Sequence, residues 1–217
     1  MALRRHEIYA KIKEDIVMGS YGIGEQLSVD DLAAKYAVSK TPVKEALNLL
    51  QAEGLVEIVP RVGYFTAPLT LKQLQDMFEL RLILEGNAVR LAAIRITPDE
   101  LSRLKEMHGS YVMGDVNTYL PWLRYNREFH HGIALASHND DLAEMVGNIL
   151  DRLQRVHWHV LDLIPFPPAD IESHERVLVA LQEGDSDAAE EALTRHINAS
   201  RDAALRKILE RPGEWTL

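Results

Sequence analysis

Residues 32–47 read LAAKYAVSKTPVKEAL, and this stretch decides the fold of the N-terminal part of the chain. Two short segments with helical apolar spacing are separated by only Ala37, Val38 and Ser39. Thr41 before Pro42 predicts the start of the second helix, because proline is tolerated in a first helical turn. Gly54 predicts its end. The pattern is typical of a helix-turn-helix.

The flanking residues extend this unit on both sides. Residues 3–18 show helical apolar spacing, and residues 19–24 are dense in glycine and predict a loop. Ser28 followed by Asp31 predicts a capped helix start. Residues 55–59 alternate like a strand, residues 60–63 predict a turn, and residues 64–66 predict a second strand. The order of three helices and a β-hairpin predicts a winged helix-turn-helix domain over residues 1–68.

The remainder, residues 69–217, shows no strand signal. Helical spacing and breakers predict helices over residues 75–93, 98–109, 115–136, 139–161, 170–183 and 185–210. The predicted fold class is therefore mainly α: a winged helix-turn-helix with a small β-hairpin wing, followed by an all-α antiparallel helical bundle.

Composition restricts the function classes. The 217 residues include no cysteine, which excludes disulfides, thiolate nucleophiles and Cys-ligated metals. No apolar run approaches the roughly 18 residues of a membrane span, so we expect a cytoplasmic protein that binds no membrane. The net charge is −9, but residues 1–68 are near neutral, with eight Lys and Arg against nine Asp and Glu. DNA binding would therefore need a local basic face.

Such a face is predicted at the start of the second helix of the helix-turn-helix. Lys40 and Lys44 are four residues apart and share a helix face. Ser39 and Thr41 add hydroxyls at the helix start, where free backbone N–H groups also suit phosphate. Arg61 lies at the predicted hairpin tip. Taken alone, the two lysines favour an ordinary solvated face; together with the tight turn, the Pro42 start and the hairpin, they favour DNA binding.

These residues carry a family resemblance. The match runs from Gly19 to Val56 and continues through residues 61–64, and it resembles the GntR superfamily of bacterial regulators. The resemblance implies operator DNA, near-palindromic and read by a homodimer, with contacts from Ser39, Lys40, Thr41, Lys44, Arg61 and Gly63. The family commonly has arginine where Lys40 and Lys44 stand, so this chain departs from its guanine-reading pattern.

A second resemblance covers residues 71–212. The segments 74–85, 126–130, 137–142, 172–177 and 184–189, ending at His196, resemble the FCD effector domain of the FadR branch in its shorter, VanR-like form. This resemblance implies a divalent transition metal, zinc or nickel, held by Asn126, His130, His174 and His196. The family often has aspartate where Asn126 stands. It also implies a repressor that responds to a small carboxylic acid.

The residues themselves leave the metal site open. Asn126 and His130 share a helix face, but His174 and His196 come from other helices, and spacing does not show that they meet. Histidines satisfied in the core are the alternative. Arg81 is our candidate for the effector carboxylate, since guanidinium binds carboxylate in a bidentate manner, and its alternative is a pair with Glu85 one turn on.

Two other function classes compete with a DNA-binding regulator. Three histidines with nearby glutamates could serve a metal-dependent hydrolase, but no motif such as HExxH is present, and we expect no enzyme. A protein-interaction module would fit the near-neutral N-terminal segment. Steep salt dependence of binding would favour DNA over that module.

Overall fold

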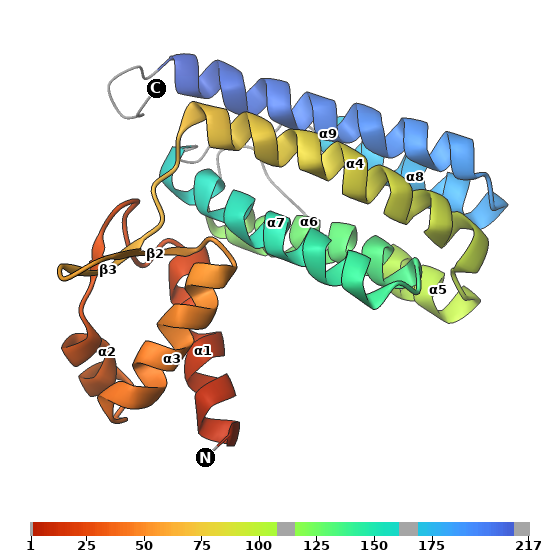
Figure 1. Cartoon of the computed structure of the whole chain (residues 1–217). Coiled ribbons are helices and arrows are strands. Elements are labelled where there is room, and N and C mark those ends of the chain that lie inside the picture. Colours follow the sequence, from red (N-terminus) through yellow and green to blue (C-terminus); the bar gives the residue numbers. More distant parts are fainter. Residues whose placement is uncertain (1, 108–115, 161–168, 211–217) are drawn as a thin grey trace.

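The fold was examined in a computed structural model that describes residues 2–107, 116–160 and 169–210. Figure 1 shows a small N-terminal unit of helices and strands beside a larger bundle of long helices. The mainly α architecture predicted from the sequence is confirmed. Within the described residues, no helix has the length and apolarity that crossing a membrane requires.

The helix-turn-helix is built from α1 (Ala2–Val17), α2 (Val29–Lys35) and α3 (Lys40–Ala52). The Ser28 hydroxyl accepts a hydrogen bond from the Asp31 amide and so caps α2. Ala37 adopts a positive φ of 53° in the tight turn before α3. The helix α3 begins at Lys40, one residue before the predicted start, with Ser39 as its N-cap residue. Buried side chains join the three helices, including Ile12, Ile16, Leu32, Val43, Leu47 and Leu50.

The predicted hairpin is present and gains a third strand. Strand β2 (Val56–Val59) pairs antiparallel with β3 (Gly63–Thr66), with Val56 opposite Thr66 and Val59 opposite Gly63. Strand β1 (Gln26–Leu27) pairs with the other edge of β3. Two residues are too few to show a strand alternation, which is why the sequence did not predict β1.

Within the described residues the bundle is formed by six helices: α4 (Leu71–Arg95), α5 (Pro98–Glu106), α6 (Val116–Ala136), α7 (Asp140–Val160), α8 (Ala169–Glu183) and α9 (Ser186–Leu209). Their bounds agree with the predicted ranges to within a few residues, and the predicted helix positions 108, 109, 115 and 161 lie outside the described residues. The largest difference is at α4, which begins four residues early. A capping box between Thr70 and Gln73 starts the helix there. Helix α4 packs against α6, α7, α8 and α9, and thus lies at the centre of the bundle (Figure 1).

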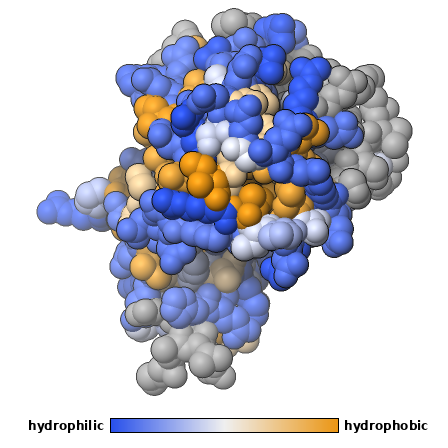
Figure 2. All heavy atoms as spheres, turned by 90° about the vertical axis from the view of Figure 1, so that its right-hand side faces the viewer, coloured by the Kyte–Doolittle hydropathy of each residue, from blue (hydrophilic) through white to orange (hydrophobic). Residues whose placement is uncertain are grey.

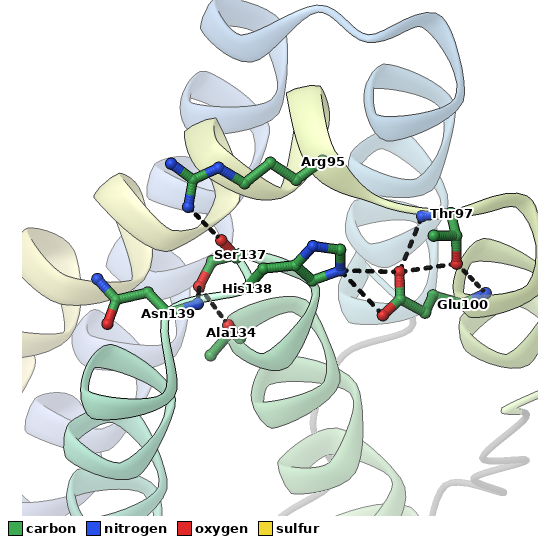
Figure 3. A network of polar contacts seen from close by, with 7 residues as sticks. All are labelled: Arg95, Thr97, Glu100, Ala134, Ser137, His138 and Asn139. Carbon is green, nitrogen blue, oxygen red and sulfur yellow. Dashed lines mark hydrogen bonds and ion pairs between the residues drawn. The ribbon is translucent and has the colours of Figure 1, made fainter.

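A polar network joins the turn between α4 and α5 to the turn between α6 and α7 (Figure 3). Arg95 donates through Nη1 to the Ser137 carbonyl at 2.6 Å, and His138 Nε2 lies 3.1 Å from Glu100 Oε1. Glu100 also completes the capping box with Thr97. The network ties down the C-terminal end of α6, the helix that carries His130.

Candidate functional site

The predicted DNA-reading residues lie at the N-terminal end of α3. Ser39, Lys40, Thr41 and Lys44 are all exposed. The Lys40 ammonium lies 2.5 Å from the Asp30 carboxylate of α2, and both side chains are largely open to solvent. Lys44 stands one turn further on the same face. The tertiary structure therefore leaves these side chains accessible, with Asp30 as a competing anion beside Lys40.

The turn between β2 and β3 presents Arg61. This residue is exposed and adopts a left-handed φ of 66°. Gly63 is half-buried with a φ of 148°, and a Cβ at this position would meet Gln26 Nε2 at 3.3 Å. Glycine adopts this φ without strain, so the β2–β3 turn can continue directly into β3. Figure 1 shows the β2–β3 turn and the N-terminal end of α3 pointing away from the helical bundle.

Three histidines from three helices meet in the core of the bundle. His130 of α6, His174 of α8 and His196 of α9 are buried, and one ring nitrogen of each lies within 4.8 Å of the others. The Nε2 atoms of His130 and His196 are 3.0 Å apart. We call these three residues the histidine cluster. The sequence could not show this convergence, because it depends on how distant helices pack.

Each ring of the histidine cluster is oriented through its Nδ1 atom. His130 Nδ1 donates to Glu85 Oε2 at 2.5 Å, since a carboxylate only accepts. His174 Nδ1 lies 3.1 Å from the Tyr125 hydroxyl, and His196 Nδ1 lies 2.7 Å from the Ser173 hydroxyl. Such outer partners are what metal-binding histidines use to hold the ring and the tautomer.

Two of the predicted metal ligands have a buried polar atom without a hydrogen-bond partner among the described residues. The two atoms are His174 Nε2 and Asn126 Oδ1. A buried polar atom without a partner is costly, so the free Nε2 of His174 inside the cluster indicates that a further group belongs there, and Asn126, one turn before His130 on α6, is a further candidate ligand. Burial lowers the pKa of His130, and lowers those of His174 and His196 well below the usual value. Neutral imidazole is the form that binds metal.

The donor set therefore fits a divalent transition metal. Three imidazole nitrogens and one amide oxygen are ligands that zinc and nickel accept. The amide of Asn126 is neutral, so these four ligands would leave the full charge of the ion uncompensated. Such an ion would retain its attraction for an anionic ligand.

Arg81 of α4 lies beside the histidine cluster but is already paired. Its Nε donates to Glu85 Oε1 at 2.5 Å, and its Nη2 lies 3.3 Å from His130 Nδ1. Arg81 and Glu85 are 4% and 2% exposed, so the intrahelical pair is a core feature. Burial by itself would raise the pKa of Glu85, but the charge of Arg81 and the hydrogen bonds from His130 and Arg81 lower it to about 2.

Sequence reasoning missed Glu85, Tyr125 and Ser173 as site residues. Glu85 lies one turn after Arg81, Tyr125 directly precedes Asn126, and Ser173 directly precedes His174. The sequence signal that could have identified them is a polar residue next to, or one turn from, each candidate site residue. The neighbouring His131 is not part of the cluster; its ring packs against Gly147 of α7.

The N-terminal unit rests on α7 through an ionic contact. Lys13 of α1 lies 2.7 Å from Glu53 and 2.8 Å from Asp151 of α7. Asp151 also accepts from Arg127 Nε of α6 at 2.5 Å. Burial alone would lower the pKa of Lys13, but the Asp151 and Glu53 carboxylates raise it above its usual value. Because Arg127 belongs to α6, this contact joins α1 and the end of α3 to α6 and α7.

Comparison with known proteins gives two family matches. Residues 4–66 match the bacterial regulatory proteins of the gntR family, and residues 76–199 match the FCD domain.

Individual relatives are transcription regulators. The chain is 34% identical over 141 residues to the Nta operon transcriptional regulator of Aminobacter aminovorans, a match spanning 62% of this chain and 64% of that protein. It is 26% identical over 215 residues to the HTH-type transcriptional regulator YdhC of Bacillus subtilis (strain 168), spanning 96% and 93%. It is 24% identical over 210 residues to the HTH-type transcriptional repressor RspR of Escherichia coli (strain K12), spanning 96% and 92%.

A solved structure has the same fold. McbR/YncC of E. coli superposes with a TM-score of 0.79 at 23% identity, covering 94% of this chain and 97% of that chain.

Proposed function

Because this chain belongs to the GntR family of transcription regulators and carries an FCD domain, we propose that it is a repressor whose hold on operator DNA responds to a small carboxylic acid. It is a regulator with a DNA-binding helix-turn-helix and belongs to no enzyme class. The observation that carries the ligand response is the buried convergence of His130, His174 and His196.

Operator recognition would use the end of α3 and the β2–β3 turn. Lys44 would reach base edges in the major groove, Ser39 and Thr41 would bind phosphate, and Arg61 would contact the adjacent backbone or minor groove. Lys40 would share its charge between DNA and Asp30. Their exposure supports this assignment.

The metal, zinc or nickel, would be held by His130, His174, His196 and Asn126. Glu85, Tyr125 and Ser173 would orient the three imidazoles. When bound, the ion would supply positive charge and open positions for an effector carboxylate. Arg81 would add a second contact by turning part of its guanidinium from Glu85 to the effector.

The active form would be a homodimer that presents two N-terminal units to a near-palindromic operator. We call the unit of α1–α3 and β1–β3 the reading head. Exposed apolar side chains on α4 and α7 support an interface on the bundle, among them Leu80, Ile83, Ile94 and Met145. Figure 2 shows apolar side chains gathered in the middle of the face where the turns from α4 to α5 and from α6 to α7 lie. Apolar patches of this kind are typical of protein interfaces.

One experiment with two variants tests the function. An operator is first selected from random duplex DNA, and binding is then measured by fluorescence anisotropy with and without bound metal and a panel of small carboxylic acids. Lys44→Ala should weaken operator binding about tenfold or more and leave metal content unchanged, since a base contact is lost. Lys72→Ala is the matched control, because Lys72 is an exposed lysine at the start of α4, far along the chain from α3.

The second variant addresses the effector site. His174→Ala should lower metal content and abolish the response to acids, while DNA binding persists without effector. His131→Ala is the control, because this ring packs against α7. Full metal retention in His174→Ala would remove that residue from the site, and unchanged operator affinity in Lys44→Ala would overturn the assignment of α3.

A further inference from the structure

A cleft of about 300 Å³ lies where the N-terminal unit meets the bundle. One wall is the face of α7 that carries Arg152 and Arg155. The opposite wall is formed by the end of α3, strand β2, the linker and the start of α4, including Gly54, Glu57, Ala67 and Gln73. This cleft lies apart from the histidine cluster, whose residues contribute nothing to its lining.

Arg155 is buried in this cleft with most of its donors unused. The residue is 5% exposed, and its Nη2 donates to the Ala67 carbonyl at 2.7 Å. A guanidinium has five N–H donors, so one hydrogen bond to a neutral carbonyl satisfies little of it. Throughout the described part of the chain, no carboxylate forms an ion pair with Arg155.

Arg152 lies one turn before Arg155 on the same face of α7. It is half-buried, and its Nε lies 3.3 Å from the position that a Cβ of Gly54 would take. No ion pair with a carboxylate is found for it in the described ranges either. Glu57 lines the cleft but does not reach either guanidinium, and Asp151 is engaged by Lys13 and Arg127.

The electrostatics agree with the geometry. Burial lowers the pKa of Arg152, and burial together with repulsion from Arg152 lowers the pKa of Arg155 to about 10. A like charge beside a buried guanidinium that has no counter-ion among the described residues is unfavourable. An oxyanion placed between Arg152 and Arg155 would reduce the repulsion between the two guanidinium groups. It would also accept hydrogen bonds from their unused N–H donors.

We propose that this cleft is a second ligand site, which binds the phosphate or carboxylate group of a small metabolite between Arg152 and Arg155. The site goes beyond the proposed function, since it needs neither the metal nor the histidine cluster. Arg152 and Arg155 bind as paired cations, and the Ala67 carbonyl holds Arg155 in place. A bound anion connects α7 to the linker and strand β2, and so restrains the reading head relative to the bundle.

The ligand is a small molecule and not the DNA backbone. The cleft lies at the C-terminal end of α3, next to Gly54, whereas the DNA-reading residues lie at its N-terminal end. A helix of 13 residues separates these ends by about 20 Å. Phosphates engaged by Lys40 and Lys44 are therefore out of reach of Arg152.

The test measures binding of inorganic phosphate and of succinate to the full-length protein by calorimetry and thermal melting, at ionic strength matched with potassium chloride. Arg152→Gln and Arg155→Gln each remove one guanidinium. Arg103→Gln is the control, because it removes the same charge from an exposed arginine of α5 that does not line the cleft. His174→Ala separates this site from the histidine cluster.

We expect saturable binding of at least one anion, weakened about tenfold or more in Arg152→Gln and Arg155→Gln and unchanged in Arg103→Gln; the binding that is lost with Arg152 should be retained in His174→Ala. Binding of phosphate alone assigns the site to phosphate esters, and binding of succinate alone assigns it to carboxylates. If Arg155→Gln fails to fold, Arg152→Gln decides. The proposal is overturned if neither anion binds saturably, if Arg152→Gln binds like the wild type, or if His174→Ala alone abolishes binding.

Discussion

At the scale of single residues, the buried carboxylate of Glu85 lies between His130, a proposed metal ligand, and Arg81, the proposed effector contact. It accepts from both His130 and Arg81 and is itself 2% exposed. Its negative charge orients one imidazole and neutralises the guanidinium. An effector carboxylate that approached Arg81 would therefore compete with a partner already in place, which would favour ligands that also gain a metal contact.

Glu85→Gln should lower metal affinity about 10- to 100-fold, because His130 loses its charged acceptor. The free energy of unfolding should fall by on the order of 3 kcal/mol, since Arg81 is left buried beside a neutral group. Metal titration and chemical denaturation measure the two effects. Glu79→Gln, exposed on the same helix, should change neither; equal metal affinity in both variants would contradict the role of Glu85.

A second residue-scale prediction concerns Asp30. Its carboxylate holds the Lys40 ammonium at the surface where DNA would bind. Asp30→Asn should tighten operator binding and steepen its salt dependence, because Lys40 is then free to neutralise a phosphate. Anisotropy titrations across a potassium chloride series provide the measurement. A flat or weaker salt dependence would show that Lys40 does not face the DNA backbone.

At the scale of elements, helix caps explain where the helices of the bundle begin. Asp185 precedes α9 and accepts from the Asp187 and Ala188 amides at 3.1 and 3.0 Å. Thr70 and Thr97 start α4 and α5 in the same local manner, each through a capping box. Helices α4 and α9 pack side by side in the bundle, and α4 carries Glu85 while α9 carries His196 of the histidine cluster (Figure 1).

Asp185→Ala should lower the free energy of unfolding by about 0.5–2 kcal/mol, because two amides at the start of α9 lose their acceptor. Metal stoichiometry should not change, since His196 lies several turns further along the helix. Asp185→Ser retains a capping oxygen and should recover most of the loss in chemical denaturation. Equal stability of the Ala and Ser variants would exclude the cap as the cause.

At the scale of the whole molecule, a few contacts connect the reading head to the bundle. Lys13 lies between Glu53, at the end of α3, and Asp151 of α7, which also binds Arg127 of α6. Coupling between two sites requires an element whose state both ligands influence. This ionic contact joins the helix that carries Asn126 and His130 to the helix that would read DNA.

Lys13→Met should reduce the factor by which an effector changes operator affinity, while leaving metal binding intact. The reason is that α1 and α3 lose their charged contact with α7. Operator titrations with saturating and zero effector give the coupling free energy. Lys11→Met, on the exposed face of the same helix, is the control. Full coupling in Lys13→Met would show that the signal passes elsewhere.

The quaternary structure supplies the last prediction. Sedimentation of the wild type should show a dimer, and the double substitution Ile83→Asp with Ile94→Asp should shift it to a monomer, since charges at a buried apolar interface are unfavourable. These side chains are 53% and 74% exposed in one chain. Val179→Asp on α8 is the control. A dimer that survives the double substitution would place the interface on another face.

The local signals in the sequence were sufficient for the fold class and for most element positions. The short turn before Ser39, the cap at Thr97 and the break at Gly184-Asp185 all act within a few residues, so spacing reveals them. Apolar spacing does not predict the start of α4, which depends on the polar capping box of Thr70 and Gln73. It does not predict strand β1 either, because a two-residue strand exists only through its pairing with β3.

The sequence alone thus determined the helices, their order and the exposed face of α3, because each depends on neighbours along the chain. Only the tertiary structure brought His130, His174 and His196 together, assigned Glu85, Tyr125 and Ser173 as their partners, and placed Arg152 and Arg155 against the linker. These contacts join segments far apart in sequence. Their geometry follows from how the helices pack, and periodicity carries no record of which faces meet.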